Sequence, residues 1–358
     1  QCGPNIPGVR GLAPAPKRPA KARFAMTDTT WDPSKPILEI ENLSISFFTR
    51  LREIPAVMDF SCTVMAGEAM GLVGESGCGK STVALAVMRD LGKNGKIVGG
   101  AIKFKGRDLT KMSEEELRHL RGSEIAMIYQ EPMASLNPAM KIGAQLAEVP
   151  MIHQGMSKDE AWKLARQIVA DVRLPDPDRI LNSYPHQLSG GMLQRAMIAM
   201  ALSCQPKILF ADEPTTALDV TVQAQILEVI QRVQQTFGTA VVLITHDLGV
   251  IARVADSVNV MYAGRNVESG SVQSIFDHPS HPYTRGLLSS LPHEGIERLH
   301  PIAGFPPNML APPSGCGFAP RCQHAIEACS AELPSLSPFE DLLTSCIRAD
   351  ELRVGRRS

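Results

Sequence analysis

The sequence predicts an α/β protein built around a parallel sheet. Three short apolar runs, at 69–73, 207–211 and 240–245, lack polar alternation and are bounded by breaker residues. Such runs are typical of strands that are buried on both faces, as they are in a parallel sheet. Helical patterns lie between them, for example at 158–172 and 221–235, and this alternation is typical of the α/β class.

The stretches around these runs predict the remaining elements in chain order. Residues 37–48 alternate apolar and polar positions and predict a strand, and residues 57–64 predict a second one. Residues 82–89 follow the first buried run and have helical character. Residues 130–188 contain no convincing strand pattern, so we expect a helical insertion there.

The composition excludes several classes of function. The 358 residues are 44% hydrophobic and 20% charged, which is ordinary for a globular protein. The net charge of −1 gives no basic footprint for DNA or RNA. No apolar run approaches the ~18–20 residues that span a bilayer. We therefore expect any role at a membrane to depend on a partner protein.

Changes in composition divide the chain into three parts. Residues 1–34 are rich in Pro, Gly, Ala, Lys and Arg without periodicity, and we expect a disordered extension without a role. Residues 35–295 carry the α/β pattern. In residues 296–358 Pro, Gly and Cys become frequent and periodicity fades, so we expect a small, irregular, cysteine-rich C-terminal extension.

A phosphate-binding loop follows the first buried run. Residues 74–81 fit G-x-x-x-x-G-K-[ST] and stand between a strand and a helix, which is the context that this motif requires. Successive backbone N–H groups of such a loop, together with the helix N-terminus, hold phosphate oxygens. Lys80 is expected to reach the β- and γ-phosphates, and Ser81 to bind Mg²⁺. The residues expected to contact the nucleotide here are Gly74, Glu75, Ser76, Gly77, Cys78, Gly79, Lys80, Ser81 and Thr82.

Two adjacent acids end the second buried run. Asp212 lies at the expected carboxyl end of a strand, where P-loop enzymes place an Asp that holds Mg²⁺. Glu213 is the next residue and can contact the attacking water as a general base. The alternative is a solvated acidic turn, but the phosphate loop favours the catalytic interpretation.

The segment Leu188-Ser189-Gly190-Gly191-Met192, followed by Leu193-Gln194-Arg195, resembles the signature motif of ABC-transporter ATPases. Other motifs are similar to those of the same family and follow the same order. They are a Q-loop glutamine at Gln130, a D-loop at Thr216-Ala217-Leu218-Asp219, a switch histidine at His246, and an adenine-stacking aromatic at Phe47, with Phe48 as the fallback. The resemblance implies an ABC-type P-loop ATPase core with an antiparallel β subdomain and a helical subdomain at about 131–190.

The resemblance also implies how the site works. Ser189, Gly190 and Gly191 donate hydrogen bonds to ATP that is held by the other subunit's phosphate loop, so two subunits enclose two ATP molecules. Gln130 joins Ser81 and Asp212 around Mg²⁺, His246 binds the γ-phosphate, and Asp219 of the D-loop is expected to contact the nucleotide. Catalytic work is expected of Glu213, His246 and Gln130.

Finer motifs resemble the dipeptide/oligopeptide/nickel branch of importers, within which the "D"-type ATPase is closest. They are Glu131–Pro138, Tyr184–Leu188, His281–Arg285 and Gly315–Cys322. This branch implies an energy-coupling subunit for uptake of peptides or a similar solute, peripheral on the cytoplasmic face of the bacterial inner membrane. The implied partners are a homologous second ATPase, two transmembrane permease subunits and an extracytoplasmic solute-binding protein. Residues 131–140 are expected to contact a permease loop.

A superfamily ATPase that acts on nucleic acid in repair or chromosome organisation is the main alternative. Those proteins carry a long coiled coil between phosphate loop and signature, whereas only 106 residues separate Ser81 from Leu188 here. A translation-type protein would need two cassettes, and a non-hydrolysing regulator is opposed by Glu213 and His246. We therefore expect no nucleic-acid partner.

Four late cysteines predict a bound metal group. Cys316, Cys322, Cys329 and Cys346 have the spacing C-x₅-C-x₆-C-x₁₆-C, which is neither the C-x₂-C of structural zinc nor a ferredoxin run. Their segment has little apolar core, so a metal would supply folding free energy. Four thiolates suit Zn²⁺ or a [4Fe–4S] cluster, and unligated or paired thiols remain an alternative. The family resemblance favours the cluster, in a structural role.

Overall fold

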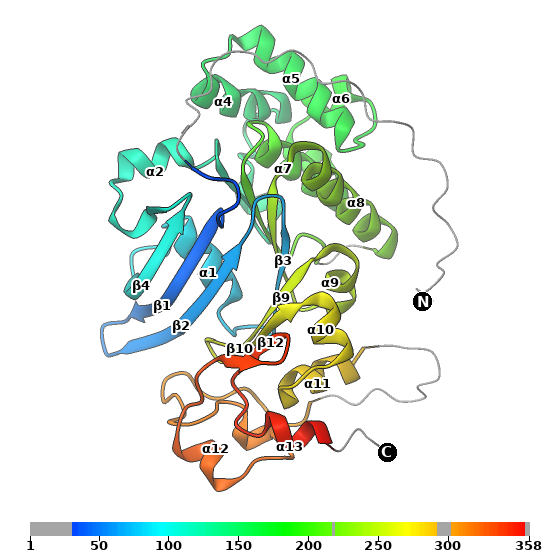
Figure 1. Ribbon diagram of the computed structural model, residues 1–358. Helices are drawn as coiled ribbons and strands as arrows, with labels where there is room; N and C mark the ends of the chain where they lie inside the picture. The colour runs from blue at the N-terminus through cyan, green and yellow to red at the C-terminus, as the bar shows by residue number, and fades with distance from the viewer. Residues whose placement is uncertain (1–30, 217–218, 292–301, 355–358) are drawn as a thin grey trace. The chain divides into compact units, whose positions relative to one another are not determined.

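The structure is a computed structural model that describes residues 31–216, 219–291 and 302–354. It confirms the α/β class: an eight-stranded mixed sheet and a four-stranded antiparallel sheet are accompanied by helices (Figure 1). The expectation for residues 1–34 falls outside the described residues as far as residue 30. The expected boundary at 295/296 also lies outside them.

The eight-stranded sheet carries the buried runs that the sequence predicts. Its strand order is β11-β12-β10-β9-β3-β8-β7-β6, with parallel pairing from β9 through β6 and antiparallel pairing from β9 to β11. Every residue of β3, β7 and β8 is buried, which explains their lack of polar alternation. The strands are β3 (Ala69–Val73), β6 (Ile125–Ile128), β7 (Ile208–Asp212), β8 (Ala240–Thr245), β9 (Ser257–Tyr262), β10 (Arg265–Ser271), β11 (Ser337–Phe339) and β12 (Leu342–Thr344).

The four-stranded sheet has the order β2-β1-β4-β5. Its strands are β1 (Leu38–Phe48), β2 (Glu53–Val64), β4 (Gly95–Phe104) and β5 (Arg107–Asp108). Buried side chains of β1 and β2 share one apolar cluster with β3, β8 and helix α1 (Lys80–Val87). The helix that follows the phosphate loop is therefore fixed between the two sheets.

Helices fill the stretch between β6 and β7, as the sequence predicts. They are α3 (Pro132–Ser135), α4 (Ile142–Gln154), α5 (Lys158–Asp171), α6 (Pro177–Asn182), the short 3₁₀ helix η2 (Pro185–Gln187) and α7 (Gly190–Leu202). A capping box starts α5, since the Ser157 side chain accepts from the Glu160 N–H and the Glu160 carboxylate accepts from the Ser157 N–H. The other helices before β10 are η1 (Leu109–Lys111), α2 (Glu114–Leu120), α8 (Val220–Phe237) and α9 (Leu248–Val254). No helix in the described ranges is both long and apolar enough to cross a membrane.

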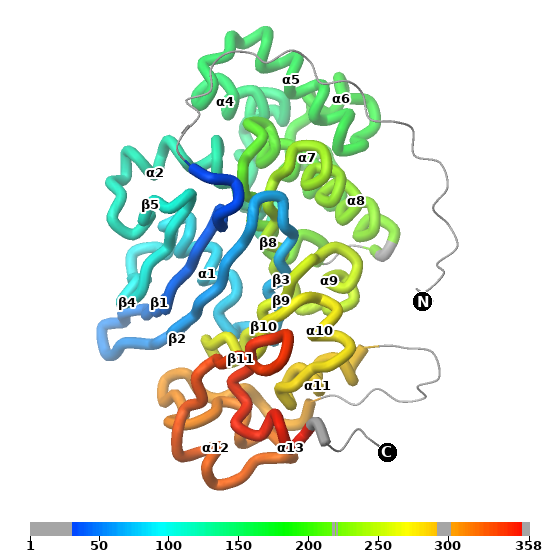
Figure 2. The backbone as a smooth tube through the Cα atoms, in the orientation of Figure 1, coloured from blue at the N-terminus to red at the C-terminus, as the bar shows by residue number. Residues whose placement is uncertain are grey.

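The C-terminal region is more regular than its composition suggests. After α10 (Val272–Asp277) and α11 (Pro282–Ser289), it contains η3 (Ala319–Arg321), α12 (Glu327–Ala331), the β11–β12 hairpin and α13 (Ala349–Val354). The hairpin pairs with β10, with Glu268 opposite Thr344, so this region extends the main sheet (Figure 2). Strands of three residues are too short to give a periodic sequence signal, which explains the difference from the expected irregular extension.

Candidate functional site

A cleft of about 560 Å³ lies at the carboxyl ends of the central strands. This volume lies in the range of small-molecule sites, roughly 300–1,000 Å³. Strands β3, β7 and β8 end beside it, as expected for an α/β sheet whose ligands bind outside the carboxyl edge. The residues that line it are Gly74, Glu75, Ser76, Gly77, Gly79, Lys80, Ser81, Thr82, Gln130, Glu213, His246 and Leu287.

Two glycines allow the phosphate loop to take its path. Gly74 has φ +152° and Gly79 has φ +104°, which L side chains rarely adopt. A Cβ at Gly74 would lie 2.2 Å from the Met261 carbonyl oxygen, and one at Gly79 would lie 2.8 Å from the Ala56 carbonyl oxygen. No side chain caps the start of α1 at Gly79. Backbone N–H groups at a helix N-terminus attract anions, so we expect the phosphates to lie against this end of α1.

Lys80 is buried beneath the loop. Its Nζ donates to the carbonyl oxygens of Gly74 at 2.7 Å and Glu75 at 3.0 Å. The Cys78 thiol lies 3.8 Å from the same Nζ, and burial raises the pKa of that thiol. The ammonium group is thus held within the loop that would surround the phosphates.

Ser81 and Asp212 meet at one side of the cleft. The Ser81 hydroxyl donates to Asp212 Oδ1 at 3.0 Å. Burial raises the pKa of Asp212, and the neighbouring Glu213 carboxylate raises it further, against the hydrogen bond from Ser81. A hydroxyl and a buried carboxylate are oxygen donors of the type that Mg²⁺ prefers.

Glu213 is held by three side chains from different segments. Its Oε2 accepts from Thr216 Oγ1 at 2.7 Å and Gln130 Nε2 at 3.3 Å, and its Oε1 lies 3.3 Å from His246 Nδ1. Burial favours the neutral acid, but the Thr216 and His246 hydrogen bonds outweigh it and lower the pKa of Glu213. Its backbone lies in the left-handed region, with φ +43°, so the chain turns sharply to aim this carboxylate.

Several residues of the predicted site do not line this cleft. Ser189 and Gly190 are exposed at the start of α7, and the Ser189 side chain makes no capping bond. Asp219 caps α8 by accepting from the Val222 N–H at 3.0 Å, and residues 217–218 of the same motif lie outside the described part. Phe47 pairs with Ile54 and Gly95 within the antiparallel sheet. The remaining members that do not line it are Gly191, Cys78 and Asp212, of which the last reaches it through Ser81.

The structure adds three residues that the sequence analysis did not assign to this site, although two of them lie within its branch motifs. Leu287 of α11 lines the cleft, and the Tyr283 hydroxyl accepts the Glu75 N–H at 2.8 Å. Arg321 of η3 forms a two-fold ion pair with the Glu75 carboxylate. No spacing rule connects residues this far apart in sequence, so the sequence could not reveal these contacts.

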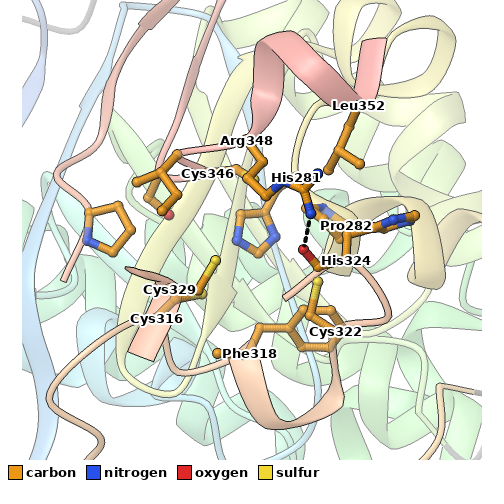
Figure 3. A pocket seen from close by; sticks show the side chains of 14 residues that line it. His281, Pro282, Cys316, Phe318, Cys322, His324, Cys329, Cys346, Arg348 and Leu352 are labelled. Carbon is orange, nitrogen blue, oxygen red and sulfur yellow. Dashed lines mark hydrogen bonds between the residues drawn. The ribbon is translucent and has the colours of Figure 1, made fainter. Parts of the chain in front are cut away.

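The four late cysteines line a second pocket, which lies in the C-terminal region (Figure 3). Burial raises the pKa of the Cys316 and Cys322 thiols and that of Cys346 to about 11. The His281 ring also lines this pocket, and its Nε2 is buried without a hydrogen-bond partner among the described residues. No group of three or more His, Cys, Asp or Glu side chains in the described ranges is arranged to hold a metal ion.

Comparisons with known proteins place this geometry in a family. The family described as "ABC transporter" matches residues 57–216, and "Oligopeptide/dipeptide transporter, C-terminal region" matches residues 267–329. The oligopeptide transport ATP-binding protein OppD of Salmonella typhimurium is 49% identical over 323 residues, which cover 89% of this chain and 96% of that protein. OppD of Escherichia coli is 48% identical over 316 residues, with 87% and 92% covered.

A solved structure supports the same placement. A dimeric ATP-binding cassette in a post-hydrolysis state, bound to ADP and phosphate, aligns with a TM-score of 0.60 at 26% identity. The alignment covers 66% of this chain and 98% of that one. Nothing in these matches supports the nucleic-acid alternative. The two family matches and the extended identity show that the chain belongs to the ATP-binding proteins of ABC transporters, in the oligopeptide/dipeptide branch.

Proposed function

We propose that the chain is the subunit that hydrolyses ATP to drive peptide uptake through a permease. The observation that carries this proposal is the arrangement at the ends of β3 and β7. The phosphate loop, the hydrogen-bonded pair Ser81–Asp212 and the carboxylate of Glu213 lie together at one cleft. The peptide class is taken from the relatives, which are named as oligopeptide transport proteins.

The residues of the cleft divide the chemistry between them. Lys80 and the loop N–H groups bind the β- and γ-phosphates, and Ser81 and Asp212 hold Mg²⁺ with Gln130 nearby. The ion supplies positive charge that offsets charge on the transferred phosphoryl group. Glu213 is ionised at neutral pH because its pKa is lowered, so it can accept a proton from water. His246, whose side chain is 62% exposed, is free to turn toward a γ-phosphate.

The signature segment supports a second ATPase as partner. Ser189 and Gly190 are exposed and do not line the cleft of their own chain, so their donors are available to ATP held by another cassette. The proposed partner is a homologous second ATPase subunit, with a second copy of this chain as the alternative. The remaining proposed partners are two permease subunits, with residues 131–140 as the contact, and a solute-binding protein. This assembly places the chain peripherally on the cytoplasmic face of the bacterial inner membrane.

We propose a [4Fe–4S] cluster in a structural role for the four-cysteine pocket. Four cysteines from separate short segments line one pocket, and His281 adds a buried nitrogen that has no hydrogen-bond partner among the described residues (Figure 3). His281 Nδ1 accepts the Tyr283 N–H at 3.1 Å, so its Nε2 carries the proton and can donate to a sulfur. One zinc ion would draw its sulfurs to within about 4 Å of each other. Zn²⁺ bound by the same four thiolates is the alternative.

Replacing Glu213 tests the proposed chemistry. We expect Glu213→Gln to reduce ATP turnover of the assembled transporter by about 10²–10⁴-fold, because general-base help is lost. ATP binding should persist, because the phosphate loop is unchanged. The matched control is Glu115→Gln, which removes an exposed carboxylate from α2. Near-normal turnover with Glu213→Gln would refute the assignment.

A further inference from the structure

Glu75 lies inside the phosphate loop, and its N–H, its carbonyl oxygen and its carboxylate all have partners within the chain. Its N–H donates to the Tyr283 hydroxyl at 2.8 Å, and its carbonyl oxygen accepts from Lys80 Nζ at 3.0 Å. Its carboxylate accepts from Arg321 Nη1 at 2.7 Å and Nη2 at 2.9 Å. Two of these three partners come from the C-terminal part of the chain, beyond the strands that build the cleft.

Arg321 is fixed in place by contacts of its own. Its remaining N–H groups donate to the Tyr262 hydroxyl at 3.1 Å and to the carbonyl oxygens of Ala303 at 2.9 Å and Ile302 at 3.3 Å. All five guanidinium donors therefore have acceptors. The side chain is 5% exposed and lies over the Tyr262 and Phe318 rings. A guanidinium held this tightly presents its two N–H groups to Glu75 in one geometry.

Tyr283 belongs to the same packed unit. Its ring lies 4.5 Å from the Tyr262 ring and 5.4 Å from the Phe318 ring, centroid to centroid, and it is fully buried. Phe318 lies two residues from Cys316, and Arg321 is the residue before Cys322. The cysteine-rich region is therefore joined to the phosphate loop through this aromatic cluster and through the Arg321–Glu75 ion pair.

The ion pair between Arg321 and Glu75 would affect ATP binding, because Glu75 is negatively charged. A carboxylate in a loop that binds a triphosphate repels the ligand unless a cation neutralises it. Lys80 is the loop's own cation, and it is required for the phosphates. Arg321 supplies a second, buried positive charge that pairs with the carboxylate.

We propose that Arg321 is a positioning residue for ATP: it neutralises Glu75 and, together with Tyr283, holds the phosphate loop open for the triphosphate. The C-terminal region thereby sets the ATP affinity of the cassette. The inference rests on the cleft being the ATP site and goes beyond the function proposed above, because that function requires no contribution from residue 321.

The test is a charge-rescue cycle in the full-length chain. We expect Arg321→Ala to weaken binding of Mg²⁺-ATP by about tenfold or more, since it leaves an uncompensated, partly buried carboxylate beside the phosphates. Glu75→Gln in the same chain should recover most of that loss, because the repelling charge is gone. In the assembled transporter the KM for ATP should rise while kcat at saturating ATP is largely kept.

Two controls separate this role from a folding effect. Arg166→Ala removes an exposed two-fold ion pair with Asp178 on the helical insertion and should leave ATP affinity unchanged. Arg321→Lys keeps the charge but loses the two-fold geometry, so it should bind ATP better than Arg321→Ala and supplies a folded variant if the alanine chain unfolds. Lys80→Ala provides the reference for a lost ATP site.

The outcomes are distinguishable. If wild type and Lys80→Ala bind ATP equally, the ATP site is misplaced and the proposed function fails. If ATP binds at the cleft but Arg321→Ala and Arg321→Lys both leave its affinity unchanged, the positioning role is refuted. A loss that Glu75→Gln does not relieve would also refute it, because damage to packing alone would not respond to the charge at residue 75.

Discussion

At the scale of single residues, burial shifts the pKa values of polar side chains, as it does at Glu268. Glu268 of β10 is fully buried, and its Oε1 accepts the N–H groups of Ser280 and His281, the latter at 3.1 Å. The Thr284 hydroxyl lies close to this carboxylate and favours its charged form. Burial raises the pKa of Glu268 to about 6, against the hydrogen bonds that favour its charged form.

This shift predicts a pH-dependent stability. The folded-state pKa lies above the unfolded value, so the stabilising contribution is complete below pH ~4.5 and is lost as the pH rises through ~6. A shift from 4.5 to about 6 corresponds to about 2 kcal/mol of unfolding free energy. Glu268→Gln should remove this dependence and raise stability at pH 7. Denaturant unfolding at pH 5 and pH 7 measures it; an equal pH difference in both proteins would contradict the prediction.

Residue motifs of the cleft could be predicted because they are local. The phosphate loop needs glycines at fixed offsets in the sequence. The apolar run before Asp212 indicates that this acid stands at the end of a strand. Ser81 and Asp212 meet as expected, and Glu213 lies beside Gln130 and His246. The Arg321 contact could not be predicted, because it joins residues 246 positions apart without any pattern between them.

At the scale of elements, long periodic segments were predictable and short ones were not. The sequence indicated β3, β7, β8, α5 and α8, since buried strands and amphipathic helices leave a clear pattern over five or more residues. The β11–β12 hairpin was missed because each strand has three residues and depends on pairing with β10. The pocket of the four cysteines is likewise assembled from short turns, including η3 and α12.

That pocket carries a prediction of its own. Protein purified without oxygen should be brown, absorb near ~400 nm and contain about four iron atoms per chain. Cys322→Ser should lower the iron content and reduce the melting temperature, because a metal group supplies folding free energy to a region with little core. Cys62→Ser, which changes a buried thiol of β2, should retain the iron. Stoichiometric zinc without iron under iron-sufficient conditions would refute the cluster.

At the scale of the whole molecule, the proposed division of the ATP site between two cassettes would leave a single chain with an incomplete site. The cleft contains the phosphate loop, Glu213 and His246, whereas the signature segment at the start of α7 is exposed elsewhere on the chain. Binding of ATP between two such surfaces would close the pair, and hydrolysis would release it. Such a cycle is a two-state element biased by a ligand, which is what an energy-coupling subunit needs.

Ser189→Ala tests this division. The Ser189 side chain makes no capping bond, so its removal should leave the stability and ATP affinity of the isolated chain unchanged. In the assembled transporter, hydrolysis at the site that Ser189 completes should fall by about 10–100-fold, the value of one hydrogen bond to a charged group. Ser157→Ala is the matched control: it removes the cap of α5 and should lower stability by about 1 kcal/mol without changing turnover per folded complex. Reduced ATP affinity in the isolated Ser189→Ala chain would place this serine in its own cleft, and unchanged turnover in the complex would exclude it from the partner's.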